Sequence, residues 1–440
     1  MIYQNITELI GNTPLLKIDQ SVHRLKNIEL YAKLEFYNPF GSLKDRIAWS
    51  MIKNDLKSIK KNNQTILESS SGNTAKALQA IASIHNIPFK TITNRIKVEE
   101  VKEILQVMGA EIEQLPGKSE CPDPTDPNDP LTHIDHIMNR EKGKYYYTTQ
   151  YTNEKNLEAQ NDSGYEIARD LERVDYFFGG LGTTGSTRGA ATIIKKTNPN
   201  LLTIGIVSSM DDYIPGIRNI NELWEVGLYE KEFYTSIQEI SSQKAINGML
   251  TLIRACGILA GPTSGASYEG TLQYLKKVDK NLKEKRTAVF IVCDRFEYYL
   301  SYIKARRPEL FGQKAKPDSL ASFPKEELEH AKLLPIANIK SWIEKNNPLI
   351  IDIRSNIAYK ASHIPGSINI PQDQLDRIVD GTMPFPKSQT ILFVCPIGEQ
   401  SKKYAAYLFL KGYDTYTLST GITGWRDKGL SLERIENKTA

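Results

Sequence analysis

The stretch "NPFGSLKDR", residues 38–46, presents a lysine at the point where a turn gives way to an apolar helix. Lys44 follows the turn directly, and "IAWSMI" comes after Asp45 and Arg46. A lysine amine is a nucleophile only when it is neutral, and burial or capture by a carbonyl group favours that state. Taken alone, such a lysine is typical of an exposed first helical turn, so its role depends on the loops that accompany it.

Two later loops contain small polar residues in an arrangement that binds anions. Each joins a strand-like run to a helix, so hydroxyls and backbone N–H groups converge at a helix N-terminus. The first, in "LESSSGNTAKALQAIA", comprises Ser70, Ser71, Gly72, Asn73 and Thr74. The second, in "GGLGTTGSTRGAA", comprises Gly182, Thr183, Thr184, Gly185 and Ser186. The first suits a carboxylate and the second a phosphate, and with one lysine they describe a pyridoxal phosphate site that holds an amino acid.

The elements that carry these loops alternate regularly. Short apolar runs rich in β-branched and aromatic residues, such as "IELYAKLE" and "VDYFFGG", precede helical patterns such as "KDRIAWSMIKNDL" and "TTGSTRGAATIIKK". This alternation predicts an α/β protein with mostly parallel, covered strands.

At 440 residues the chain is long enough for two or three domains. Residues 115–130 hold five prolines and several acids, which predicts a long exposed loop. Residues 312–332 have the composition of a linker, and strand-helix alternation restarts beyond them. We therefore expect one domain over residues 1–311, with a mobile subdomain at roughly 42–145, and a second domain over residues 333–440.

Composition and charge argue against several classes of function. The 56 basic and 52 acidic residues leave a net charge of +4 that is spread along the chain, so neither nucleic acid nor a membrane is an expected partner. No apolar run is long enough to span a bilayer, and the N-terminus lacks a signal-peptide pattern. We expect a cytoplasmic protein.

Neither the cysteines nor the histidines predict a disulfide or a metal site. The closely spaced His133 and His136 have no third ligand nearby and indicate a solvated helix face. No C-x-x-C pair occurs among the widely separated cysteines, which are Cys121, Cys256, Cys293 and Cys395.

Together with "IGNTPLLKI" at residues 10–18, and in this order, the lysine and the two loops resemble the fold-type II pyridoxal-phosphate family of cysteine synthases and cystathionine β-synthases. The resemblance covers residues 1 to about 310. It implies two α/β subdomains with mostly parallel sheets, pyridoxal 5'-phosphate as the cofactor, an amino-acid substrate and a homodimer.

The resemblance also implies roles for individual residues. Lys44 would be the Schiff-base lysine and the acid/base at the substrate Cα. The loop from Ser70 to Thr74 would hold the substrate carboxylate, assisted by Gln150 in "TQYTNEKN", and Asn73 would also lie near the 3'-oxygen of the cofactor.

On the cofactor side, the loop from Gly182 to Ser186 would bind the phosphate. Thr263, in "LAGPTSGAS", matches the hydroxyl that faces the pyridine nitrogen. A neutral hydroxyl does not hold that nitrogen protonated, so the chemistry is biased toward β-elimination and away from transamination.

The chain departs from the family pattern at several positions. Thr184 occupies a glycine position of the phosphate loop, and Ala75 replaces the glycine after the asparagine loop. In "CDRFEYYLS", residues 293–301, Arg295 and Phe296 would alter the edge of the cofactor site.

The leaving group on the substrate Cβ can be acetate, phosphate or hydroxide. "GLGTTGS" and "PGIRNINELWEVGLY" resemble the O-phosphoserine-using sulfhydrylases, whose phosphate-binding arginine matches Arg218; a surface arginine is the alternative. Arg188 and Arg295 are rival anion ligands. The "TTGS" and "DR" features are shared with 2,3-diaminopropionate synthases, which add an amine instead of sulfur.

The C-terminal region resembles a single rhodanese domain over its full length. Cys395 ends a buried strand and begins the loop "CPIGEQS" before a helix, so N–H groups point at its sulfur and favour a thiolate or persulfide. Glu399 and Gln400 stand where an arginine is frequent, although Lys402 and Lys403 partly restore the positive field.

These features predict a β-replacement enzyme that works through an α-aminoacrylate on an O-activated serine, with O-phosphoserine favoured and O-acetylserine possible. Cys395 would supply or relay sulfane sulfur, giving cysteine or cysteine persulfide. Two alternatives remain open: a diaminopropionate-type synthase with an amine nucleophile, and a rhodanese domain that serves only to dock a partner or sulfur donor.

Overall fold

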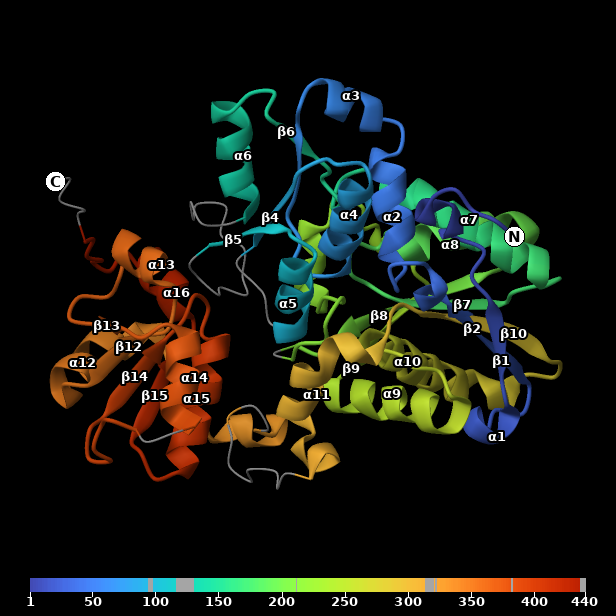
Figure 1. Cartoon of the computed structure of the whole chain (residues 1–440). Helices are drawn as coiled ribbons and strands as arrows, with labels where there is room; N and C mark the ends of the chain where they lie inside the picture. Colours follow the sequence, from blue (N-terminus) through green and yellow to red (C-terminus); the bar gives the residue numbers. More distant parts are fainter. Residues whose placement is uncertain are drawn as a thin grey trace. The chain divides into compact units, whose positions relative to one another are not determined.

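The computed structural model describes residues 1–93, 98–115, 130–210, 212–312, 320, 323–380 and 383–435. They form two compact units (Figure 1). The first comprises Met1–Gln114 and Ile134–Lys304, and the second comprises Leu115–His133 and Ala305–Ala440. Most of the expected loop at residues 115–130 lies outside the described residues.

The larger sheet of the first unit has six strands in the order β1-β2-β10-β7-β8-β9, parallel except for the β1–β2 pair. Its strands are β1 (Leu15–Ile18), β2 (Ile28–Leu34), β7 (Tyr176–Gly180), β8 (Leu202–Ser208), β9 (Ser236–Ile240) and β10 (Arg286–Val292). Figure 1 shows one pair of helices on each face. The pairs are α7 (Lys155–Asp170) with α8 (Gly185–Thr197), and α9 (Ser242–Cys256) with α10 (Pro262–Val278). Because both faces are covered, the central strands are continuous apolar runs.

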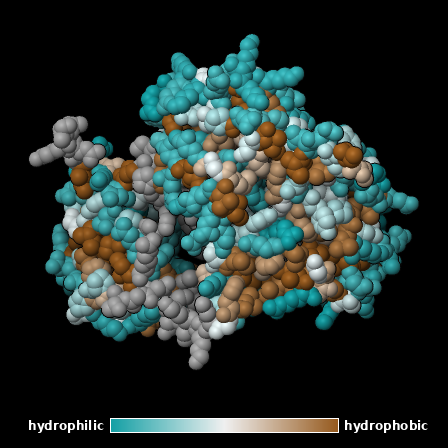
Figure 2. All heavy atoms as spheres, in the orientation of Figure 1, coloured by the Kyte–Doolittle hydropathy of each residue, from teal (hydrophilic) through white to brown (hydrophobic). Residues whose placement is uncertain are grey.

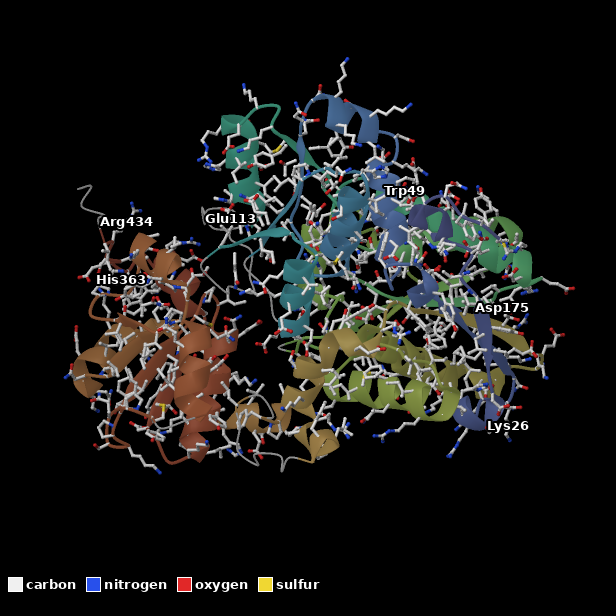
Figure 3. The ribbon with its side chains drawn as sticks, viewed as in Figure 1. Lys26, Trp49, Glu113, Asp175, His363 and Arg434 are labelled. Carbon is white, nitrogen blue, oxygen red and sulfur yellow. The ribbon has the colours of Figure 1, made fainter. Side chains whose placement is uncertain are left out.

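Hydrogen bonds at the sheet ends fix the register of neighbouring strands. Asp175, labelled in Figure 3, accepts the Thr287 N–H at 2.9 Å and so joins the start of β7 to β10. The loop of residues 182–186 follows the opposite, carboxyl end of β7, and ligands of open parallel sheets bind at such strand ends.

The smaller sheet of the first unit is entirely parallel, in the order β5-β4-β3-β6. Its strands are β3 (Thr65–Glu68), β4 (Phe89–Thr93), β5 (Glu111–Gln114) and β6 (Tyr145–Tyr147). The nearby helices are α2 (Lys44–Ile52), α3 (Leu56–Lys61), α4 (Asn73–Ile84), α5 (Glu99–Val107) and α6 (Pro130–Arg140). Figure 2 shows mainly hydrophilic atoms over the α3 end. Two short helices, α1 (Gln20–His23) and α11 (Leu300–Arg306), complete the unit.

The second unit is built on a five-stranded parallel sheet in the order β11-β15-β14-β12-β13. Its strands are β11 (Lys332–Leu334), β12 (Leu349–Asp352), β13 (Ile368–Asn369), β14 (Ile391–Val394) and β15 (Thr415–Leu418). Its helices are α12 (Ile339–Asn346), α13 (Asn356–Ala361), α14 (Gln372–Asp380), α15 (Glu399–Leu410) and α16 (Gly421–Asp427). Leu320 lies in its core and Lys332 opens β11, so parts of the expected linker pack into this unit.

The expected α/β class with mostly parallel sheets is confirmed. Over the ranges just given, no helix has the length and apolar character needed to cross a membrane. Cys256, Cys293 and Cys395 are free thiols, and Cys121 lies outside the described residues.

Candidate active site

Lys44 is the first residue of α2, and its side chain is partly buried. Its Nζ lies 3.5 Å from the Thr183 hydroxyl of the second anion-binding loop, so the structure brings the two sequence motifs together. Burial lowers the pKa of Lys44 from 10.5 to about 8, because a charged amine is poorly solvated there. A considerable fraction of the amine is therefore neutral near physiological pH.

The two residues that follow Lys44 fix the start of α2. The Asp45 carboxylate accepts the Phe40 N–H at 2.6 Å and the Ser42 hydroxyl at 3.1 Å. The buried Arg46 guanidinium pairs with Glu35 at 2.8 Å and with Glu166 at 2.8 Å. The three residues of "KDR" therefore have complementary positions: Lys44 faces the site, while Asp45 and Arg46 anchor the start of the helix.

The same ionic network holds the N-terminal "GNTP" stretch. Glu166, from α7, accepts the N–H groups of Asn12 at 2.8 Å and Thr13 at 3.2 Å, and it pairs with Lys33 at 2.6 Å. These cations hold the pKa of Glu166 down to about 2 against the opposing effect of burial.

The first anion-binding loop leads into α4, which begins at Asn73. The Ser70 hydroxyl accepts the N–H groups of Gly72 and Ala75, each at 3.3 Å, and so shapes the turn. Gln150 joins this loop from the neighbouring strand end. Its amide accepts the Thr74 hydroxyl at 2.8 Å and donates to the Ser69 carbonyl at 3.0 Å. Ser71 and Gly72 remain partly exposed.

Glu68, which the sequence analysis did not single out, holds the first anion-binding loop in place. Its fully buried carboxylate accepts the N–H groups of Ser69 at 2.8 Å and Gln150 at 3.2 Å, and also the Thr148 hydroxyl. Burial raises its pKa to about 7. Glu68 therefore ties the end of β3 to the segment after β6.

Asp294 is a second site residue that the sequence analysis missed. Its carboxylate accepts the Asn73 amide at 2.6 Å and the hydroxyl of Tyr299, and Asn73 also donates to Tyr299 at 3.2 Å. Asp294 belongs to the unusual "CDRFEYYLS" segment, in which the family pattern marks only Arg295 and Phe296 as departures.

The second anion-binding loop has an open helix N-terminus. Thr184 is the N-cap of α8 at a φ of 63°, and its side chain makes no capping bond. The first N–H groups of α8 thus have no partner within the helix. A Cβ at Gly182 would lie 2.5 Å from the Gly216 carbonyl oxygen, so only glycine fits this close approach.

Asn156 lies beside this loop and was also missed. Its amide donates to the Gln150 carbonyl at 2.7 Å and to the Thr183 hydroxyl at 3.1 Å, while its buried Oδ1, beside Gly185, has no partner. It stands in the "TQYTNEKN" stretch, from which only Gln150 had been selected.

Thr263 and Arg218 flank the same loop. The buried Thr263 hydroxyl donates to the Pro215 carbonyl, and the Arg218 N–H donates to the Leu181 carbonyl at 2.9 Å. The Arg218 guanidinium lies 5.3 Å from the centroid of the Tyr151 ring.

Arg188 and Arg295, the two other candidate anion ligands, each contact a glutamate. Arg188 donates to the Leu228 carbonyl and pairs with Glu230 at 2.6 Å. Arg295 donates from Nε to Glu297 at 3.0 Å.

In the second unit, Cys395 follows β14 and is fully buried. Its sulfur accepts the Gly398 N–H at 3.1 Å and the Ser401 hydroxyl at 3.2 Å. Ser401 is 2.6 Å from the Thr417 hydroxyl. One backbone donor and one hydroxyl therefore face the sulfur, in place of the frequent arginine.

Arg354 and His363 make contacts within this unit. Arg354 pairs with Asp352 at 2.7 Å and donates to the Ser362 carbonyl at 2.6 Å. His363, labelled in Figure 3, stacks on Tyr359 with 4.1 Å between ring centroids. Within the ranges that the structure describes, no group of three or more His, Cys, Asp and Glu side chains could hold a metal ion.

Comparisons with known proteins match a known family to a part of each unit. Residues 6–294 match the family of pyridoxal-phosphate dependent enzymes, and residues 336–428 match the rhodanese-like domain. A cysteine synthase of Aquifex aeolicus (strain VF5) is 28% identical over 305 residues, which cover 68% of this chain and 91% of that protein.

Solved structures give the same picture for the first unit. A hydrogen sulfide-producing enzyme from Fusobacterium nucleatum aligns with a TM-score of 0.59 and 28% identity, covering 68% of this chain and 99% of that one. An O-acetylserine dependent cystathionine beta-synthase from Helicobacter pylori aligns with a TM-score of 0.58 and 25% identity. The alignment covers 68% of this chain and 98% of that one.

The chain belongs to the family of pyridoxal-phosphate dependent enzymes, as a relative of the cysteine synthases, and it carries a C-terminal rhodanese-like domain. The family, fold and cofactor expected from the sequence are thus confirmed. The residues also fit the cofactor: Lys44 is a partly neutral amine, and the open N-terminus of α8 presents N–H donors that suit a phosphate group.

Proposed function

We propose that this enzyme replaces the phosphate group of O-phosphoserine with sulfur, and that the rhodanese-like domain supplies the sulfur. Cysteine synthase relatives support the β-replacement chemistry. When bound, pyridoxal phosphate supplies an electron-accepting ring that labilises the substrate Cα–H bond and allows a group to leave Cβ.

Separate side chains bind the cofactor, bind the substrate and move the proton. Lys44 holds the cofactor aldehyde and then moves the proton at the substrate Cα. The loop of residues 70–74 binds the substrate carboxylate at the N-terminus of α4, with Gln150 keeping the loop in shape. The loop of residues 182–186 binds the cofactor phosphate. The Thr263 hydroxyl, which donates to the Pro215 carbonyl in this structure, would face the pyridine nitrogen of the bound cofactor.

The position of Arg218 carries the phosphoserine proposal. Its backbone is bonded to Leu181, next to the phosphate loop, and its guanidinium lies over Tyr151, next to Gln150. It thus stands between the loop proposed for the cofactor and the one proposed for the substrate. The Arg218 guanidinium also donates to the Glu222 carbonyl at 3.4 Å, and Arg188 and Arg295 pair with glutamates. A guanidinium suits a phosphate leaving group because it can bind two oxygens at once.

A substrate screen tests this assignment. We expect Arg218→Ala to lower kcat/KM for O-phosphoserine by about 10- to 100-fold, the range for a charge-assisted hydrogen bond, while kcat/KM for O-acetylserine changes little. Arg295→Ala is the matched control and should leave the preference intact. Equal loss for both substrates, or loss in the control alone, would overturn the role of Arg218.

Sulfur delivery is assigned to Cys395 because two donors face its sulfur and favour an anionic thiolate or persulfide. Its complete burial means that the loop must open to receive a sulfur atom. A thiol reductant would cleave the Cys395 persulfide, releasing its outer sulfur as sulfide while the thiol is oxidised to a disulfide. In the presence of that reductant, Cys395→Ser should abolish product formation from a sulfane-sulfur donor and leave sulfide-dependent formation unchanged. Undiminished flux from the donor would instead favour a docking module, and turnover only with an amine nucleophile would favour a diaminopropionate-type synthase.

We also propose that the protein is a homodimer. Large apolar side chains are exposed in the first 16 residues, at Ile2, Tyr3, Ile6, Leu9 and Leu16. Figure 2 shows hydrophobic atoms interrupting the hydrophilic surface near the N-terminus. Burying them between two copies would remove this surface from water. Light scattering of the purified protein should give the mass of a dimer, and a monomer at all concentrations would contradict this.

A further inference from the structure

Lys76 is a buried cation next to the candidate active site to which no role has been given. It lies one turn after Asn73 on α4 and is only 6% exposed. Its Nζ has no hydrogen-bond partner and lies 3.5 Å from the centroid of the Tyr298 ring. An isolated ammonium is costly to bury, so other charges must compensate it.

Two buried carboxylates provide that compensation. Asp45 follows Lys44 in the chain, and Asp294 accepts the Asn73 amide at 2.6 Å. Both carboxylates interact electrostatically with Lys76. Burial raises the pKa of each carboxyl group, whereas the Lys76 charge lowers it, and the balance leaves Asp294 with a pKa of about 6.

The other groups around the two carboxylates are neutral or already paired. Beside Asp294 are the hydroxyl of Tyr299 and the thiol of Cys293, and burial raises the pKa of both. Glu35 acts on Asp45 and is itself paired with Arg46 at 2.8 Å. Among the described residues, Lys76 is therefore the cation that acts on Asp294.

We propose that Lys76 is a positioning residue of the cofactor site, whose charge keeps Asp294 ionised at neutral pH so that Asp294 holds the Asn73 amide in place. The proposal rests on the proposed function, with Asn73 placed near the 3'-oxygen of the cofactor as the family resemblance implies. It depends on neither the leaving group nor the source of sulfur, so its failure can be told apart from theirs.

The expected signature is a change in pH dependence. Lys76→Met keeps an unbranched side chain over Tyr298 but removes the charge. Asp294 then takes up a proton at a higher pH, and its neutral carboxyl group is a weaker acceptor for Asn73. Lys76→Arg retains the charge and should behave like the wild type.

Fluorescence titration of the apoprotein with pyridoxal phosphate, from about pH 5.5 to about pH 8.5, measures this effect. For the wild type and Lys76→Arg we expect affinity to fall below about pH 6. For Lys76→Met the midpoint should move up by about one pH unit, which makes binding about twofold weaker near pH 7, approaches a tenfold loss at the acidic end and leaves it near normal at the alkaline end. Asp294→Asn should remove the fall in affinity near pH 6.

A matched control separates this effect from general loss of a buried lysine. Lys90, on β4, pairs with Glu111 and Glu113 at 2.8 Å each, and Glu113 is labelled in Figure 3. Lys90→Met should keep the wild-type midpoint. Lys76→Gln also removes the charge, so it replaces Lys76→Met in this test if the methionine variant does not fold. An unchanged midpoint in the uncharged Lys76 variants, or equal weakening at every pH, would overturn the proposal.

Discussion

The Thr184 hydroxyl donates a 3.0 Å hydrogen bond to the Leu228 carbonyl, and the Arg188 guanidinium donates to the same oxygen. Thr184 adopts a left-handed φ of 63°, which is unfavourable for a β-branched residue. The bond gives a physical reason for a threonine where the family pattern has glycine: the side chain fastens the segment after β8 to the proposed phosphate loop.

Substitutions at Thr184 should separate strain from hydrogen bonding. Thr184→Ala keeps the strained backbone and loses the bond, so we expect a loss of about 1 kcal/mol in the free energy of unfolding. Thr184→Gly loses the bond but relieves the strain, so it should lie close to the wild type. Urea unfolding measures both variants, and a glycine variant less stable than the alanine variant would contradict this balance.

The buried Arg46 should be critical for folding. Arg46→Met leaves Glu35 and Glu166 buried without their guanidinium partner, at 2.8 Å in the wild type. We expect the free energy of unfolding to fall by about 3 to 5 kcal/mol. Arg169→Met, at an exposed salt bridge on the same helix as Glu166, is the control and should cost less than about 1 kcal/mol. Similar losses in both variants would refute the importance of the buried network.

The rate of cofactor capture should report the pKa of Lys44. A lowered pKa increases the neutral fraction of the amine at a given pH, so capture of the aldehyde should accelerate as pH rises through about 8 and then level off. Stopped-flow absorbance after mixing apoprotein with pyridoxal phosphate measures this rate. A midpoint near 10.5, the value of an exposed lysine, would show that burial does not act as described.

Ser401 should stabilise the anionic form of the Cys395 sulfur. Its hydroxyl is 3.2 Å from that sulfur, and Thr417 supports it at 2.6 Å. Ser401→Ala removes one of the two donors to this sulfur, so alkylation of Cys395 at a fixed, neutral pH should become about tenfold slower, since hydrogen bonds to charged groups contribute about 1.5 to 3 kcal/mol. The rate of alkylation, followed by mass spectrometry at Cys395, is the measurement. Ser341→Ala, on the exposed surface of α12, is the control, and an unchanged rate in Ser401→Ala would rule out this role.

Local sequence signals predicted the loops because each lies between a strand and a helix within a short stretch. Lys44 at the start of α2 and Asn73 at the start of α4 follow from turn residues and apolar periodicity alone. The rhodanese-like loop at Cys395 was found for the same reason. The roles of these residues stay predictions until the variants above are measured.

Residues that act across long sequence separations escaped prediction. Asp294 meets Asn73 from 221 residues away, and Arg46 meets Glu166 from 120 residues away. No periodicity within a single chain segment carries such a pairing. Lys76 was missed for a related reason, because one lysine on a helix indicates a solvated face until tertiary packing shows that it is buried.

Lys44 is proposed to support β-replacement on an O-activated serine. The most direct measurement is mass spectrometry of the amino-acid product after the cofactor-loaded protein is incubated with O-phosphoserine and sulfide. We predict that the wild type forms cysteine and that Lys44→Ala, with its fold verified by circular dichroism, forms none above the uncatalysed rate. Absence of a thiol product from the wild type with O-phosphoserine, O-acetylserine and serine alike would contradict the account.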